Sequence, residues 1–200
     1  MTNNYAAIIE NNIGQLFEMD LDQRAVAMGA QCQAGSLMFK AFGKPCVLSP
    51  RGIALDQIDQ SGPMGIVISL YALQARTDEV IEAPFKSFKE LPDSMPYVGA
   101  FTNRTELALV PAVEKLVGMR QQIHDTFDAG DAPADVAGDL VFVVRPLPKI
   151  ALCYVCYLAD EDFPAAVTCL YSQNAHCFLS TDALADLGEY TTKALLALAF

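Results

Sequence analysis

Two apolar runs flank a short acidic turn in the last third of the chain, and this pattern constrains the fold most strongly. Residues 149–159 (KIALCYVCYLA) and 164–171 (PAAVTCLY) are each long enough for one strand, and the turn lies between them. The first run is apolar at both odd and even positions, which is typical of a strand covered on both faces. The sequence therefore predicts an antiparallel hairpin inside the core.

A CxxC pair inside the first of these strands, Cys153 and Cys156, suggests a redox or metal site as an alternative. Because side chains alternate along a strand, residues three positions apart point to opposite faces. We therefore interpret the pair as buried, structural thiols. Cys169, on the second strand, would meet Cys153 only if the hairpin register set them directly opposite each other. A thiol-dependent redox or metal-binding protein that uses Cys153, Cys156 and Cys169 is the alternative function.

Hydrophobic periodicity and turn residues predict the other elements. Helices are expected over 5–17, 21–28, 61–77, 103–117, 119–127 and 180–198, short meander strands over 36–55, and a strand over 139–148. Pro111 argues against the continuity of the fourth helix. Residues 83–100 are expected to be irregular but docked, and 128–139 to form a mobile loop.

Together these elements predict an α+β fold. We expect a mainly antiparallel sheet of five or six strands, covered by helices. Residues 1–200 are expected to form a single globular domain, with N-terminal helices over 1–30.

Charge excludes some classes of partner. The net charge is −11, and residues 121–200 carry 11 acidic but only 3 basic side chains. Nucleic acid and anionic membrane surfaces would be repelled by this half of the chain, so neither is expected as a partner. A protein partner, a homodimer and a small-molecule ligand all stay open.

The N-terminal region lacks the basic segment and apolar core of a signal peptide. The longest apolar runs are too short to span a bilayer. We therefore expect a cytoplasmic protein whose cysteines are free thiols.

The sequence contains no recognisable catalytic constellation. It has two histidines, His124 and His176. His124 is expected to face solvent from an amphipathic helix. His176 adjoins Cys177, but neighbouring side chains diverge in any regular element, which argues against a Cys–His nucleophile. No nucleotide-binding, metalloprotease or calcium-loop motif is present, so an enzyme is not favoured, no metal site is expected and no cofactor is demanded.

The last third, GDLVFVVRPLPKIALCYVCYLADEDFPAAVTCLYSQNAHCFLSTDALADL, resembles a domain-of-unknown-function family of anaerobic bacteria and archaea. The upstream segments FGKPCVLSPRGI, ISLYALQA and FKSFKELPDSMPYVGAFTNR occur in the order which that family shows, so the resemblance covers about residues 40–198. Some members carry an added iron–sulfur cluster domain, but this chain has no four-cysteine cluster segment. The resemblance implies no established activity.

The resemblance and the charge pattern together indicate one candidate surface site. Three adjacent carboxylates, Asp160, Glu161 and Asp162, repel one another, and a cation or a basic partner would relieve that repulsion. We expect a site where these residues converge with Arg104 and Tyr97. The predicted function is a cytoplasmic accessory or ligand- or partner-binding domain of anaerobic metabolism, without chemistry of its own. A small-molecule enzyme using the carboxylates of this turn is a third hypothesis.

Overall fold

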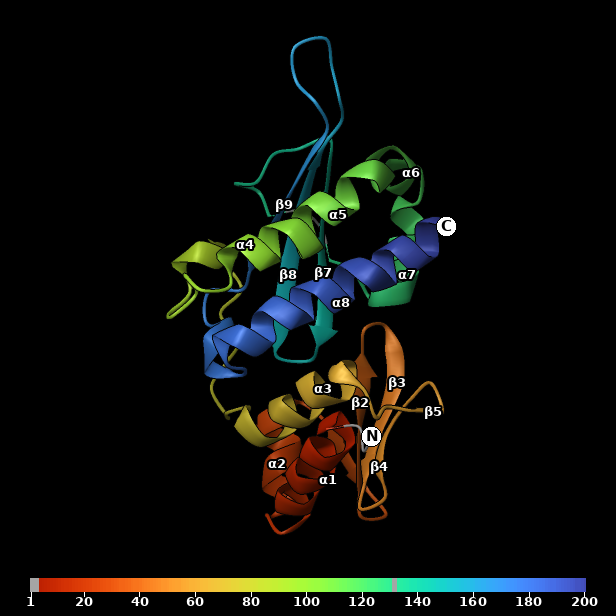
Figure 1. The fold of residues 1–200 in the computed structure, drawn as a ribbon, viewed down its shortest axis with the longest axis vertical. Helices are drawn as coiled ribbons and strands as arrows, with labels where there is room; N and C mark the ends of the chain where they lie inside the picture. The colour runs from red at the N-terminus through yellow and green to blue at the C-terminus, as the bar shows by residue number, and fades with distance from the viewer. Residues whose placement is uncertain (1–3, 131–132) are drawn as a thin grey trace.

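Two antiparallel sheets organise the computed structural model, which describes residues 4–130 and 133–200 (Figure 1). Within these residues the meander sheet has the strand order β1-β2-β3-β4-β5, and the hairpin sheet has the order β6-β9-β8-β7. The strands are β1 Gln31–Gln33, β2 Ser36–Ala41, β3 Lys44–Ser49, β4 Gly52–Leu55, β5 Ile58–Asp59, β6 Lys86–Ser87, β7 Leu140–Leu147, β8 Ile150–Tyr157 and β9 Ala166–Tyr171. The α+β class and the antiparallel pairing are confirmed, and the strands are divided between two sheets.

Helices pack on each sheet. On the meander sheet lie α1 Asn4–Phe17, α2 Leu21–Met28 and α3 Pro63–Gln74. The long C-terminal helix α8, Thr181–Ala199, crosses the hairpin sheet, with α4 Val98–Phe101, α5 Leu107–Leu109, α6 Val113–Gly118 and α7 Arg120–Phe127 beside it (Figure 1). Short helical turns complete the chain: η1 Phe88–Glu90, η2 Thr102–Glu106, η3 Val110–Ala112 and η4 Ala175–Cys177. No helix in the described part of the chain is long and apolar enough to cross a membrane.

The bounds of α2 show how local sequence sets an element. Asp20 precedes the helix and its side chain accepts hydrogen bonds from the backbone N–H groups of Asp22 and Gln23, which satisfies donors that a helix start leaves free. Gly29 follows the last residue in a left-handed conformation with φ 68°, where glycine is favoured. The predicted helix over 21–28 is confirmed.

The helical segment predicted over 103–117 is longer and less regular than expected. It runs from Val98 to Gly118 and contains a π-helical turn, η2, and a 3₁₀ turn, η3. Pro111 lies at the start of η3, where a missing N–H costs little. The proline therefore changes the type of helix without ending the segment.

The hairpin sheet is covered on both faces, as the sequence predicts. Tyr154, Cys156 and Cys169 belong to the main core, whereas Cys153 and Val155 belong to a second cluster on the other face. Irregular segments supply that second cover through Phe85 and Val136. Val136 belongs to the predicted loop over 128–139, of which residues 131–132 lie outside the described part of the chain.

Phe42 and Tyr71, on the meander-sheet side, each form a hydrogen bond to β7 or to the β7–β8 turn of the hairpin sheet. The Phe42 N–H donates to the carbonyl of Pro146 over 2.8 Å. The Tyr71 hydroxyl on α3 donates to the Met28 carbonyl over 2.6 Å and accepts from the Lys149 N–H over 3.1 Å. The main core is continuous across this junction.

Candidate functional site

An apolar cleft lies at this junction, and we call it the junction cleft. It has a volume of about 490 Å³. Its walls come from the β2–β3 turn, the end of β4, the start of α3, the end of α7 and one side of α8, which lie close together in Figure 1. The lining residues are Phe42, Lys44, Leu55, Met64, Thr126, Phe127, Tyr190, Lys193, Ala194, Ala197 and Leu198.

Gly43 permits the close approach that forms one wall. Its φ is 76°, and a Cβ atom built there would lie 2.6 Å from the Thr126 carbonyl oxygen. Only glycine avoids both the conformational cost and the clash. The β2–β3 turn can therefore lie against the end of α7, which sets Phe42 and Lys44 on either side of the turn at the cleft.

The α8 wall combines small residues with one aromatic ring. Ala194 and Ala197 leave room in front of the helix, and the Tyr190 ring meets Phe42 edge to face with centroids 6.4 Å apart. Burial, together with the charges of Asp186 and Glu189, raises the pKa of Tyr190 to about 12. Its hydroxyl is therefore protonated at neutral pH and can donate a hydrogen bond.

Two lysines supply the positive charge of the cleft. Lys44 Nζ lies 3.7 Å from Asp56 and Lys193 Nζ lies 2.6 Å from Glu189, and both lysine side chains are more than half exposed. The Lys44–Asp56 pair is exposed at both side chains, whereas the Glu189 side chain is only 15% exposed. Exposed ion pairs contribute only about 0–1 kcal/mol, so an anionic group entering the cleft could replace Asp56 at small cost.

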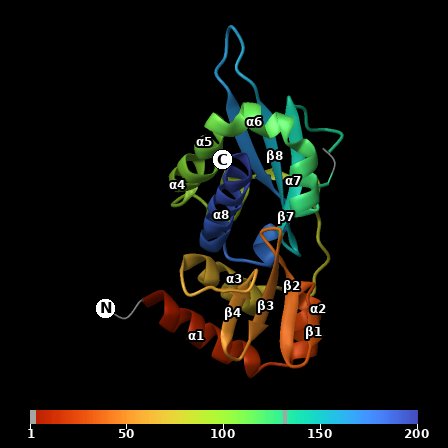
Figure 2. The ribbon, with the colours of Figure 1, turned by 90° about the vertical axis from the view of Figure 1, so that its right-hand side faces the viewer.

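The acidic turn predicted as a surface site lies at the tip of the β8–β9 hairpin, which projects beyond the helices at one end of the molecule (Figures 1 and 2). Asp160, Glu161 and Asp162 are all exposed. The Asp160 side chain accepts hydrogen bonds from the backbone N–H groups of Asp162 and Phe163 over 2.9 and 2.7 Å. This carboxylate thus has a local role in shaping the turn.

The other two residues of that predicted site lie elsewhere. Arg104 forms an ion pair with Glu189 of α8 over 3.3 Å. Tyr97 lines a separate cleft together with His176. Within residues 4–130 and 133–200, no hydrogen bond or ion pair joins the acidic turn to either of them. The five residues are thus not brought together, and a binding role for the acidic turn stays a prediction.

The CxxC thiols face opposite sides of β8, as predicted. In the hairpin register Cys153 is opposite Leu170, and Cys169 is opposite Tyr154, so Cys153 and Cys169 do not form a cross-strand pair. Burial raises the pKa of Cys153 to about 11 and that of Cys156 to about 12, and it also raises the pKa of Cys169. In the described part of the chain, no three metal-ligating side chains cluster. This geometry does not support the thiol site that we kept as an alternative.

The expectation for His176 and Cys177 is wrong. Their side chains do not diverge, because Cys177 Sγ lies 3.9 Å from His176 Nε2. Both residues belong to the single 3₁₀ turn η4. A turn this short is not a regular element of the kind on which the prediction relied. His124, by contrast, is exposed on α7 as predicted.

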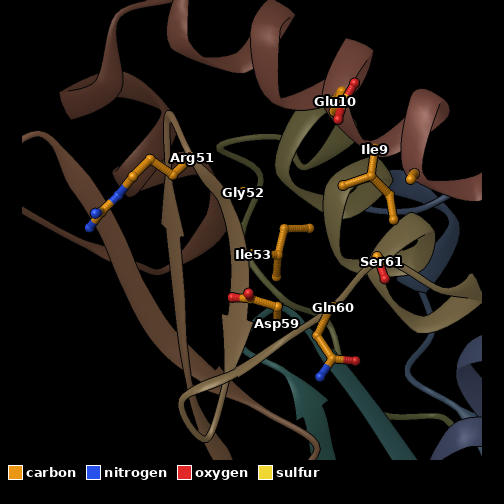
Figure 3. Close-up of a pocket in the computed structure, with 9 residues that line it drawn as sticks. Ile9, Glu10, Arg51, Gly52, Ile53, Asp59, Gln60 and Ser61 are labelled. Carbon is orange, nitrogen blue, oxygen red and sulfur yellow. The ribbon is translucent and has the colours of Figure 1, made fainter.

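A smaller cleft lies between α1 and the β4–β5 end of the meander sheet (Figure 3). Its volume is about 190 Å³. Ile9 and Glu10 approach it from α1, with Ile53 and Asp59 opposite, while the Arg51 side chain is directed away (Figure 3). Its small volume and scarcity of aromatic walls make it a weaker candidate than the junction cleft.

The residues of the junction cleft were not identified from the sequence. They come from five segments separated along the chain, and no motif links them. The sequence contained one indication of this cleft. Ala194 and Ala197 lie on α8 away from its buried face, and small side chains on one side of a helix leave space beside it.

The fold and cleft define an α+β protein with a ligand-sized apolar cleft and without a recognisable catalytic constellation in its described residues. Residues 20–194 match the model of DUF3786, a domain of unknown function, and the chain belongs to this family. No curated protein and no solved structure matches it. The predicted relation to a domain-of-unknown-function family is confirmed, while anaerobic hosts and an added iron–sulfur domain stay predictions.

Proposed function

We propose that the chain is an accessory ligand-binding domain whose junction cleft takes a small molecule with an apolar body and one anionic group. A role in anaerobic metabolism is part of this proposal and rests on the sequence resemblance alone. The proposal assigns no reaction to the cleft.

The apolar lining of the junction cleft carries the proposal. Sites for small molecules are concave, mostly apolar and about 300–1,000 Å³ in volume, with a few polar groups that orient the ligand. The junction cleft, at about 490 Å³, falls in this range. Phe42, Phe127 and Tyr190 supply aromatic surface, and Thr126 and the Tyr190 hydroxyl supply hydrogen-bonding groups.

The charged residues of the cleft lining favour a ligand with a negative charge. Lys44 and Lys193 are the charged residues of the cleft lining, in a chain whose net charge is −11. A positive pair on an acidic protein favours an anionic group, such as a carboxylate or a sulfonate, near the mouth of the cleft. The apolar walls then bury the rest of the molecule.

A fluorescent anion tests the proposal. 8-Anilinonaphthalene-1-sulfonate combines an aromatic body with one sulfonate, and the chain has no tryptophan to contribute background emission. We expect saturable binding to the native protein. Ala197→Phe, an exposed position on α8, should fill the cleft and weaken binding at least about tenfold, and Lys44→Gln or Lys193→Gln should weaken it up to about fivefold.

Two control variants separate the cleft from the rest of the surface. Ala7→Phe adds the same ring to an exposed position on α1, and Lys89→Gln removes a lysine outside the cleft. Both should leave dye affinity unchanged. Because the dye also binds partly unfolded proteins, thermal unfolding of every variant is measured in parallel. Equal dye affinity for Ala197→Phe and Ala7→Phe would refute the proposal.

The tip of the β8–β9 hairpin supports a second candidate, docking of a basic protein partner. Phe163 is 70% exposed there, next to Asp160, Glu161 and Asp162. An exposed aromatic residue beside negative charge can anchor an interface. If affinity capture from extract recovers a partner, Phe163→Ser should release it at constant salt. A partner that stays bound to that variant would argue against this candidate.

A further inference from the structure

Cys177 differs from the other cysteines in its surroundings. It lies on η4, just before α8, is half buried, and its Sγ is 3.9 Å from His176 Nε2. His176 lines an open cleft of about 430 Å³ together with Tyr97 and Thr181. The thiol is thus next to an imidazole that borders a space large enough for a small molecule.

The imidazole beside the thiol is in its uncharged form. Burial lowers the pKa of His176, and the positive charges of Lys86 and Arg76 lower it further. The imidazole is therefore neutral at physiological pH and can accept a proton. Asp93 and Asp182 line the same cleft as His176 and carry negative charge there.

The environments of the other five cysteines raise the pKa of their thiols. Cys46, Cys153, Cys156 and Cys169 are buried, and burial raises the pKa of each. Cys32 is exposed, but desolvation and the neighbouring carboxylates of Asp22 and Asp20 raise its pKa. Cys32 therefore serves as an internal comparison, because it is an accessible thiol beside negative charge.

We propose that Cys177 is a reactive thiol, with His176 as its proton acceptor, that forms mixed disulfides with small disulfide compounds entering through the adjacent cleft. The Cys177 S–H gives its proton to His176. The thiolate then attacks one sulfur of the compound R–S–S–R, so that a bond forms between Cys177 Sγ and that sulfur and the S–S bond of the compound breaks. Cys177 is oxidised to the mixed disulfide, and the leaving thiolate takes the proton from His176 and departs as R–SH.

Native-state titration with 5,5′-dithiobis(2-nitrobenzoate), a small aromatic disulfide, tests this inference. We expect one fast phase of one thiol per chain, with mass spectrometry of peptides placing the modification on Cys177. The fast phase should disappear in Cys177→Ser and persist in Cys32→Ser. His176→Gln should slow it at least roughly tenfold at neutral pH, because the variant lacks the group that accepts the thiol proton.

The pH profile distinguishes a proton acceptor from a structural role. The rate advantage of the unmodified protein over His176→Gln should vanish at alkaline pH, where the thiol ionises without help. His124→Gln, an exposed histidine on α7, is the matched control and should not alter the rate. A fast phase that survives in Cys177→Ser would overturn the proposal. So would equal rates for His176→Gln and His124→Gln at every pH. Neither outcome depends on the junction cleft.

Discussion

The two sheets differ in how many of their faces are buried. In the meander sheet, β3 and β4 alternate between buried and partly exposed residues, with Leu48 and Ile53 buried and Val47 and Ala54 half exposed. In the hairpin sheet, every residue of β8 except Tyr157 is buried. A sheet with one open face needs helices on one side only. A sheet covered on both faces needs a second layer, which irregular segments supply here.

This difference predicts the largest effect on stability. Leu152 on β8 is fully buried in the main core, so Leu152→Ala should lower the free energy of unfolding by about 2–5 kcal/mol. Val47→Ala, on the partly exposed face of β3, should lower it by less than about 1 kcal/mol. Urea denaturation of both variants gives the comparison. Equal losses would mean that the meander sheet is covered by something else, such as a second molecule.

An intermediate effect is expected where the two sheets meet. Gly43→Ala introduces a side chain at φ 76° and places its Cβ 2.6 Å from the Thr126 carbonyl. The strain should lower the free energy of unfolding by about 1–3 kcal/mol and should also weaken binding of the fluorescent anion. Gly35→Ala is the control, because Gly35 has a similar φ of 71° but no neighbour near its Cβ position. If both variants bind the dye equally, the close approach does not shape the cleft.

The smallest effect is expected at the edge of the hairpin sheet and depends on pH. Hydrogen bonds from the Ser87 side chain and backbone lower the pKa of Glu90. Because the folded-state pKa is depressed, the contribution of Glu90 to stability is present above its ordinary pKa of about 4.3 and is lost as pH falls through the folded-state value. Glu90→Gln should therefore be slightly less stable than the original protein at neutral pH. That difference in stability should disappear in acid. Thermal unfolding of both proteins from neutral to acidic pH measures it, and a difference that persists unchanged would exclude the Glu90 carboxylate as its source.

Local signals predicted most elements. The bounds of α2 follow from residues adjacent in sequence, and the β8–β9 hairpin follows from its turn and its apolar flanks. The division of the strands between two sheets was not predicted. The pattern of apolar residues in a strand indicates which of its faces are buried, but not which other strands share its sheet. The hairpin register was also left open. Odd- and even-numbered positions of β8 are both apolar, so a shift of one residue in the register would leave the apolar pattern of the strand unchanged.

Sites proved harder to predict than elements. The junction cleft depends on five segments that only the tertiary fold brings together, and the contact between His176 and Cys177 depends on the geometry of one short turn. The acidic turn was prominent in the sequence because its charges are adjacent. Adjacency along the chain does not indicate which distant residues approach, and Arg104 in fact pairs with Glu189.

The Tyr71 hydroxyl restricts how a ligand can enter the junction cleft. One oxygen atom holds both the Met28 carbonyl at the end of α2 and the Lys149 N–H in the β7–β8 turn. A hinge motion that separated the two sheets would have to break the hydrogen bond between Lys149 and the buried Tyr71 hydroxyl, which is costly in a low-dielectric setting, whereas the bond to Met28 lies within the meander-sheet side. Rotation of the exposed Lys44 and Lys193 side chains breaks neither bond. A ligand is thus expected to enter when the Lys44 and Lys193 side chains rotate, while the two sheets keep their positions. Rotation of exposed side chains is faster than domain motion.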